Sequence, residues 1–373
     1  MLEEKNVSDA ITLSHIWKRF DKKIVLDDIS LSIRQNEFFV LIGPSGVGKT
    51  TLLRLIAGLE RPSSGEIRFG DRVMNDVEPQ GRKVRMAFEN YSLYPHLSVW
   101  ENLASPLKVS GMNKEGIRQR VQEMADMLDI GKLLNRLPGE LSNGQRQRVS
   151  LGRALVVDSE AFLLDEPLAH LDARIRHELR AKFQDIKSFI KQGSVIYVTH
   201  DYQEALALGD RIAVLDSGKI QQIGTPEEIY NNPCNLKVAS LIGQPIMNIE
   251  DVDIVKNNDS VLLKNENIEL NVPRSLGEKL KLRVGTRIKM GIRPQHWLTS
   301  SAEVERTNGG LDAVVSLLEV RNYKGVVRMT RGNFSTYLLK EDYGAIREGD
   351  RIRITPNWEE VHFFDDLGDR IAV

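Results

Sequence analysis

The fold of this chain is decided by residues 38–51, which read Phe-Phe-Val-Leu-Ile-Gly-Pro-Ser-Gly-Val-Gly-Lys-Thr-Thr. The continuous apolar run at 38–42 is typical of a strand buried on both faces of a parallel sheet. Residues 43–51 fit the pattern G-x-x-x-x-G-K-[ST], and residues 48–58 have a helical pattern. The sequence therefore predicts a strand, a phosphate-binding loop and a helix in succession.

The residue types of this loop suit a phosphate ligand. Glycines let the backbone curl so that successive N–H groups point at phosphate oxygens, and the helix N-terminus adds positive potential. We expect Lys49 to lie between the β- and γ-phosphates and Thr50 to supply a hydroxyl to Mg²⁺. The predicted nucleotide-binding residues of the loop are Gly43, Pro44, Ser45, Gly46, Val47, Gly48, Lys49, Thr50 and Thr51.

Two more buried strands are predicted at 161–164 and 195–198, and polar residues follow each of them. One carboxylate at a strand end can hold Mg²⁺ through water, and a second can orient or deprotonate the attacking water. We assign the first role to Asp165 and the second to Glu166. At the other strand end, His200 can contact the γ-phosphate and hold the catalytic carboxylate in place. The alternatives are two capping carboxylates and a structural histidine.

A second serine- and glycine-containing segment, Leu-Ser-Asn-Gly-Gln at 141–145, opens a predicted helix. It lies between the phosphate loop and the acidic pair at 165–166. Such a segment can clamp a phosphate, and here it can complete a site only on the nucleotide of another subunit.

An aromatic side chain to stack on the purine is predicted at Phe20, just before the alternating strand at 24–33. Aromatic rings bury a large flat surface, which suits a base. Trp17 competes for this role, and a plain core aromatic is the alternative for both.

Composition limits the function classes. Lys and Arg (51) nearly balance Asp and Glu (52), and a nucleic-acid partner would usually leave a basic patch, so no nucleic-acid partner is expected. The lone Cys234 cannot form an internal disulfide, which suits the cytoplasm. The polar N-terminus does not look like a signal peptide, and the sequence contains no run of about 18 apolar residues. Any role at a membrane is therefore expected to depend on a membrane-embedded partner.

The pattern of elements predicts two domains. Residues 1–240 alternate strands and helices, which indicates an α/β parallel core with a helical insertion at about 90–157. Residues 241–373 contain strand-like runs separated by turn signals such as Asn308-Gly309-Gly310, which predicts a small all-β barrel.

The order of these motifs resembles the ATP-binding-cassette (ABC) ATPases across residues 1 to about 240. The matching segments are GPSGVGKTT (43–51), LSNGQRQRVSLGRAL (141–155), FLLDEPLAHLD (162–172) and VTHD (198–201). The segment 88–96 resembles the loop where such importers meet their transmembrane subunits. Residues 291–296 and 361–365 are similar to the C-terminal OB-type regulatory domain of maltose-type importers.

The resemblance implies two cassettes facing head to tail, with each ATP held between one chain's phosphate loop and the other chain's signature. Ser142, Asn143, Gly144 and Gln145 would then contact the partner's nucleotide, and Asp172 would lie in the loop by which the two sites sense each other. It also implies two permease subunits contacted near 89–96, an indirect extracytoplasmic solute-binding protein, and a place on the cytoplasmic face of the membrane. The expected activity is ATP hydrolysis that drives import of a sugar or sugar derivative, with a sugar alcohol, glycerol or glycerol phosphate included.

Four residues depart from the family pattern, at three places in the chain. Glu89 replaces the usual glutamine; as an anion it could ligate Mg²⁺, so we count it among the catalytic and metal candidates. Asn143 replaces a signature glycine, and asparagine tolerates a positive φ. Ala169-His170 replaces a small polar pair. These departures leave a homodimer and a heterodimer with a second cassette both open.

Other functions remain as alternatives. They are a cassette of a polyamine, metal or anion importer, a soluble ABC ATPase acting on nucleic acid, and a P-loop kinase. The signature segment argues against the kinase, which has no use for a clamp on another subunit's phosphate.

Overall fold

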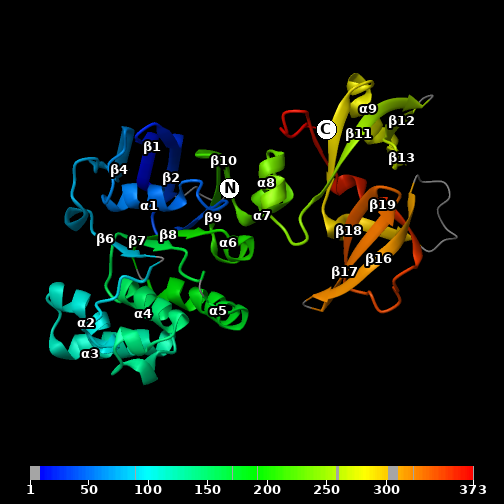
Figure 1. Ribbon diagram of the computed structural model, residues 1–373. Coiled ribbons are helices and arrows are strands. Elements are labelled where there is room, and N and C mark those ends of the chain that lie inside the picture. The colour runs from blue at the N-terminus through cyan, green and yellow to red at the C-terminus, as the bar shows by residue number, and fades with distance from the viewer. Residues whose placement is uncertain are drawn as a thin grey trace, which may run out of the picture. The chain divides into compact units, whose positions relative to one another are not determined.

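The computed structural model describes residues 9–88, 90–169, 171–190, 192–257, 260–300, 310–321 and 323–372 (Figure 1). The chain forms two compact units, Met1–Ile229 and Tyr230–Val373.

A six-stranded sheet forms the centre of the N-terminal unit, in the order β10-β9-β3-β8-β7-β6. The neighbours of β3 and β7 all run parallel to them, and every residue of β3, β7 and β8 is buried, as the apolar runs predict. The carboxyl ends of these three strands therefore meet at one edge of the sheet. The strands are β3 (Phe38–Ile42), β6 (Val84–Ala87), β7 (Ala161–Asp165), β8 (Ser194–Thr199), β9 (Arg211–Asp216) and β10 (Lys219–Gly224).

A second sheet of the same unit is antiparallel, with the order β2-β1-β4-β5. Helix α1 (Lys49–Ala57) lies between the two sheets (Figure 1), and its leucines share one core with Leu13 of β1 and Leu41 of β3. On the opposite face of β3, Phe38 packs edge to face with Phe183 of α5. The antiparallel strands are β1 (Asp9–Phe20), β2 (Lys23–Arg34), β4 (Ser64–Phe69) and β5 (Arg72–Val73).

The predicted helical insertion contains three α-helices, and α4 packs against β6 and β7 of the central sheet. Ser98 caps α2, Asn113 caps α3 and Ser142 caps α4, each by accepting a backbone N–H, as short polar residues at helix starts commonly do. The helices are α2 (Val99–Val109), α3 (Lys114–Met127) and α4 (Asn143–Leu155), followed after β7 by α5 (Ala173–Phe189), α6 (Tyr202–Leu208) and α7 (Pro226–Asn231).

The C-terminal unit is built around two five-stranded antiparallel sheets, β13-β12-β11-β14-β20 and β15-β19-β16-β17-β18. Both sheets contribute to one core around the fully buried Trp297, which agrees with the all-β second domain that the sequence predicts. Its strands are β11 (Asn248–Asn257), β12 (Ser260–Lys264), β13 (Glu269–Asn271), β14 (Arg287–Ile292), β15 (Trp297–Ser300), β16 (Leu311–Arg321), β17 (Lys324–Arg331), β18 (Phe334–Lys340), β19 (Arg351–Pro356) and β20 (His362–Phe364).

This unit begins at Tyr230, earlier than the boundary at 240/241 that the sequence predicts. The reason is the buried Arg293, whose guanidinium donates to the carbonyl oxygens of Tyr230 and Ile242. Leu236, the first residue of α8 (Leu236–Leu241), also donates its N–H to the carbonyl oxygen of Gly368. The segment that precedes β11, the first strand of this unit, is therefore held both by Arg293 and by residues near the end of the chain. The remaining helix is α9 (Arg274–Leu280).

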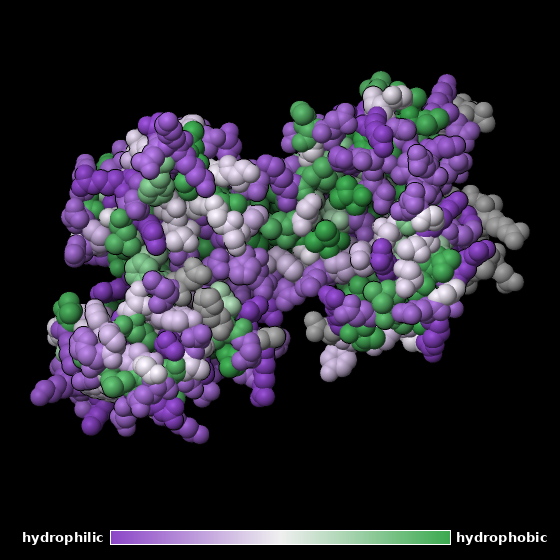
Figure 2. Space-filling view, in the orientation of Figure 1, coloured by the Kyte–Doolittle hydropathy of each residue, from purple (hydrophilic) through white to green (hydrophobic). Residues whose placement is uncertain are grey.

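Within the described part of the chain, no helix is long and apolar enough to cross a membrane. On the face of the N-terminal unit seen in Figure 2, apolar residues form small separate groups between hydrophilic ones. This mixture is ordinary for a protein surface and marks no single patch.

Candidate functional site

The phosphate loop leaves the end of β3 and requires glycine for two physical reasons. A Cβ at Gly43 would lie 2.1 Å from the carbonyl oxygen of Leu215, so no other residue fits there. Gly46 and Gly48 take φ values of 79° and 110°, a region that favours glycine. Pro44 and Ser45 are exposed at the crest of the loop. The loop thus keeps its backbone open to a ligand.

Lys49 is buried at the base of this loop. Its Nζ donates to the carbonyl oxygens of Gly43 and Pro44, both at 2.9 Å, and lies 3.6 Å from Oε1 of Glu166. Gly48 is the N-cap of α1 and has no side chain to occupy the first N–H groups of the helix. These N–H groups and the lysine give the site its positive character, which suits phosphate.

Thr50 and Asp165 bring two oxygen donors together at the end of β7. The Thr50 hydroxyl donates to Oδ1 of Asp165 at 3.1 Å, and Asp165 is buried. Hydroxyl and carboxylate oxygens are the donors that Mg²⁺ prefers. The residues present therefore fit the metal that the sequence predicts.

Glu166 is held in an unusual backbone conformation directly after β7. Its φ is 46°, and its N–H donates to the carbonyl oxygen of Val198 in β8 at 3.0 Å. Its carboxylate lies between Lys49 and His200, whose Nδ1 is 2.8 Å from Oε2. Backbone strain of this kind is often found at functional sites. Predicted residues from the phosphate loop and from the ends of β7 and β8 are therefore in contact.

Ser142 and Gln145 form a reciprocal cap at the start of α4. Gln145 N donates to the Ser142 hydroxyl at 3.3 Å, and Ser142 N donates to the Gln145 side chain at 3.0 Å. Asn143 is exposed and is the first residue of α4, so its tolerance of a positive φ is not used here. Gly144 adjoins Leu171, where a Cβ would lie 2.9 Å from Cδ2.

Asp172 and Phe20 lie at the ends of their elements. Asp172 caps α5 by accepting the N–H of Ile175 at 2.9 Å. Phe20 ends β1 with 42% of its surface exposed, and Lys18 Nζ lies 4.6 Å from the centre of its ring. Trp17 is half-buried, so Phe20 is the more accessible of the two aromatic candidates.

Glu89 and His170, two of the positions that depart from the family pattern, lie outside the described residues. The loop residues that follow Glu89 are held by hydrogen bonds from two helices, α2 and α4. Asn102 of α2 is fully buried and bonds both N and O of Tyr94, at 2.9 and 3.1 Å. Ser150 of α4 donates to the carbonyl of Tyr91 at 2.7 Å. The exposed Tyr94 is thus presented by a rigid support.

Sequence reasoning missed several polar residues that support the site. Gln147 is buried in α4 and donates to the carbonyl of Glu166 at 3.1 Å. Glu204 is buried in α6 and accepts from Tyr197 and Thr199, at 2.8 and 2.7 Å. Burial raises the pKa of Glu204, and its two hydroxyl partners oppose that shift. The signal available in the sequence was a polar residue on the apolar face of a helix, but such a residue does not identify the group with which it forms a hydrogen bond.

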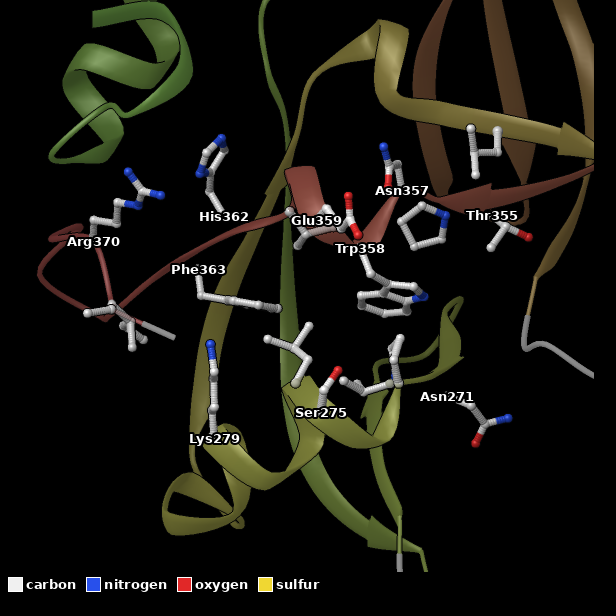
Figure 3. Close-up of a pocket in the computed structure, with 18 of the residues that line it drawn as sticks. Asn271, Ser275, Lys279, Thr355, Asn357, Trp358, Glu359, His362, Phe363 and Arg370 are labelled. Carbon is white, nitrogen blue, oxygen red and sulfur yellow. The ribbon is translucent and has the colours of Figure 1, made fainter. Parts of the chain in front are cut away.

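The C-terminal unit has a cavity of about 1170 Å³ beside α9 and β20 (Figure 3). Trp358 and Phe363 line it together with Lys279 and Arg370. His362 also lines it, and burial lowers the pKa of this histidine to about 4, so the ring is neutral near pH 7. No residue of the predicted nucleotide site lies here.

Comparison with known families agrees with both units. The family described as ABC transporter matches residues 26–169, and the MalK OB fold domain matches residues 243–297. The first match includes the phosphate loop, the signature segment and the acidic pair.

Several known proteins are similar over nearly the whole chain. The trehalose/maltose import ATP-binding protein MalK of Thermococcus litoralis is 38% identical over 95% of this chain and 97% of that protein. The sn-glycerol-3-phosphate import ATP-binding protein UgpC of Cupriavidus metallidurans is 40% identical, over 93% and 94%.

A solved structure supports the nucleotide-binding fold. It is the dimeric post-hydrolysis state of the ATP-binding cassette MJ0796 bound to ADP and Pi, with a TM-score of 0.54 and 29% identity. It covers 58% of this chain and 98% of its own. ATP-binding import subunits of this kind are ATPases coupled to transport, and they work as dimers with permease subunits. The chain belongs to the ABC transporter family, as an ATP-hydrolysing importer subunit of the maltose type.

Proposed function

We propose that the contact between Glu166 and His200, beside Lys49, is the centre at which this chain hydrolyses ATP to drive solute import. Oε2 of Glu166 accepts from His200, and Oε1 faces Lys49. This arrangement places a proton acceptor next to a cation at the phosphate loop. We base the proposal on this arrangement because general-base catalysis needs a carboxylate that is oriented as well as ionised.

Each residue has a separate role. Lys49 and the N–H groups of residues 43–51 bind the phosphates. Thr50 and Asp165 would hold Mg²⁺, which would supply positive charge to neutralise the phosphates. Glu166 accepts the proton of the attacking water, and His200 fixes the orientation of that carboxylate. Glu89 is a further candidate for catalysis and for the metal, and Phe20 is the candidate for stacking on the purine.

The second half of each site comes from another cassette. The start of α4 is exposed at Ser142 and Asn143, and Asp172 follows Leu171, which lies against Gly144. Ser142, Asn143, Gly144 and Gln145 would contact the partner's ATP, as they would in a head-to-tail dimer. A homodimer and a heterodimer both satisfy this arrangement.

The transport partners follow from the family. Two permease subunits would dock near residues 89–96, where Tyr94 is exposed on its rigid support. An extracytoplasmic solute-binding protein would act through these permeases, and the chain would lie on the cytoplasmic face of the membrane. The solute is proposed to be a sugar or sugar derivative, glycerol phosphate included, because relatives named for trehalose/maltose and for sn-glycerol-3-phosphate align over almost the whole chain.

Co-purification of the full chain from native membranes tests this proposal. We expect two permeases and a solute-binding protein to be recovered, and ATPase activity that rises with permeases, binding protein and solute. Stimulation by nucleic acid, or phosphorylation of a small acceptor, would overturn it. Recovery of a second, different cassette, with full activity only in its presence, would decide for the heterodimer.

A further inference from the structure

Arg176 of α5 joins two segments on which the catalytic pair depends. Its Nη2 donates to the carbonyl oxygen of Leu171 at 3.1 Å, and its Nη1 lies 3.6 Å from Oδ2 of Asp201. Leu171 is in the loop that follows Glu166, and Asp201 directly follows His200. One guanidinium therefore spans the loop after the carboxylate and the turn that carries the histidine.

The turn that carries His200 is held on both sides. Thr199 Oγ1 donates to the buried Glu204 at 2.7 Å and accepts the N–H of Asp201 at 3.0 Å. Oδ1 of Asp201 accepts the N–H of Gln203 at 2.7 Å and so caps α6. These bonds hold the backbone on both sides of His200, so a displacement of Asp201 is passed to the turn that carries the imidazole.

Little free space separates the two segments. A cavity of about 10 Å³ lies between them, which is room for about one water molecule. It is lined by Glu166, Ala169, Arg176, Thr199, His200, Asp201 and Glu204. Because packed groups transmit a displacement that an open gap would absorb, the loop and the turn are mechanically connected.

The loop also meets the signature segment, since Leu171 lies against Gly144 and Asp172 caps α5. We propose that Arg176 is a positioning residue that couples the loop at 171–172 to His200 and, through it, to Glu166. A displacement of the signature segment or of the loop at 171–172 would then shift the catalytic pair of the same chain. This inference rests on the catalytic roles proposed above for Glu166 and His200.

The guanidinium is suited to this connection because its planar fork offers several donors in fixed directions. A lysine carries the same charge but only one compact ammonium, which cannot reach the Leu171 carbonyl and the Asp201 carboxylate in the same way. Arg176→Lys is therefore expected to lose the coupling while keeping the charge.

The chain offers a matched control in Arg180, one turn further along α5. Its Nη1 donates to the Gln203 side chain at 3.1 Å, so it also joins α5 to α6. Its Nη2 lies 3.2 Å from Nδ1 of His177, within its own helix. Arg180→Ala therefore removes a contact between the same helices without breaking the proposed connection.

The experiment measures ATP hydrolysis, ATP binding and the thermal midpoint for the full chain with its permeases. Arg176→Ala and Asp201→Asn, which keeps a capping oxygen, are expected to lower kcat by up to about 100-fold while KM changes little. The double variant is expected to be no worse than either single variant, because both break one connection. Arg180→Ala should keep nearly full kcat. If Arg176→Ala does not fold, Arg176→Lys carries the same expectation.

Two results would overturn the inference. One is a kcat for Arg176→Ala or Arg176→Lys no lower than for Arg180→Ala, and the other is additive losses in the double variant. Glu166→Gln, measured alongside, separates this failure from that of the proposed function. If Glu166→Gln keeps full hydrolysis, the proposed catalytic centre is wrong; if it abolishes hydrolysis while Arg176→Ala matches the control, only the coupling is wrong.

Discussion

His200 Nδ1 lies 2.8 Å from Glu166 Oε2, although the two residues follow different strands, β8 and β7. An ionised carboxylate only accepts hydrogen bonds, so in this pair the histidine Nδ1 donates. The contact exists because β7 and β8 are parallel neighbours whose carboxyl ends lie side by side. The orientation of the proposed catalytic carboxylate is therefore a consequence of the sheet order.

Replacing the carboxylate should separate binding from hydrolysis. Glu166→Gln keeps the shape of the side chain but removes the base, so we expect ATP binding to be retained and kcat to fall by about 10²–10⁴-fold. Nucleotide-binding and turnover assays on the same preparation check this. Glu160→Gln, at an exposed glutamate on the approach to β7, should leave both values unchanged. Equal losses of binding and turnover would contradict the assigned role.

A methyl group at the first glycine of the phosphate loop should damage the fold locally. In Gly43→Ala the new Cβ would overlap the Leu215 carbonyl, and overpacking of this kind costs about 1–3 kcal/mol. We expect a lower thermal midpoint and weaker ATP binding, because the loop must move away from β9. Gly139→Ala is the control, since its Cβ would meet nothing within 4 Å. A wild-type midpoint for Gly43→Ala would show that the close approach is not required.

The assignment of residues 230–242 to the C-terminal unit can be tested at Arg293. Arg293→Met would leave the Tyr230 and Ile242 carbonyl oxygens without this donor, and each buried unsatisfied group costs about 1–3 kcal/mol. We expect faster hydrogen exchange and easier proteolysis at 230–242. Arg283→Met, at an exposed position, should change neither. Unchanged exchange in Arg293→Met would contradict the assignment.

The stability of the C-terminal unit should depend on the protonation of Glu250. Burial, and next the charge of Asp251, raise its pKa from 4.5 to about 7. The folded form therefore binds this proton more tightly than the unfolded form, so the stabilisation is full below about pH 4.5 and is lost as the pH rises through about 7. Because Glu250 is only half-buried and solvent screens its charge, we expect a loss of about 1–2 kcal/mol.

Thermal unfolding of the full chain between pH 4.5 and 8 measures this dependence. Glu250→Gln, which cannot ionise, should flatten the decline above pH 4.5. Glu269→Gln, at an exposed glutamate of β13, should retain the wild-type profile. If the Glu250→Gln profile also keeps the wild-type slope, Glu250 is not the group responsible.

Most of the proposed nucleotide site could be predicted from the sequence because its parts are local. The loop at 43–51, the acidic pair after 161–164 and His200 after 195–198 each follow an apolar run that predicts a buried strand. Polar residues that directly follow parallel strands of one sheet lie at the same edge of that sheet, so no further information is needed to predict that they come together. The strand lengths and the helix at 48–58 follow for the same reason.

The polar supports of the site could not be read in this way. Asn102, Gln147, Arg176 and Glu204 each bond a group that is distant in sequence or lies on another element, and their spacing does not identify that partner. Likewise, the sequence showed only that Asn143 tolerates a positive φ, whereas the Ser142 cap places it in an ordinary helix. A side-chain contact of this kind depends on packing between elements.

By itself the sequence determined the strand–loop–helix unit, the residue types of the site and the change to an all-β second domain, since these depend on local periodicity and motif spacing. Only the tertiary structure decided that Tyr230 begins the second unit and that the loop at 171–172 is tied to the His200 turn. Both depend on one guanidinium each: Arg293 donates to the carbonyl oxygens of Tyr230 and Ile242, and Arg176 joins the Leu171 carbonyl to the Asp201 carboxylate, which the fold brings within reach. Hydrogen-bonding groups removed from water need partners, and the fold selects which ones they find.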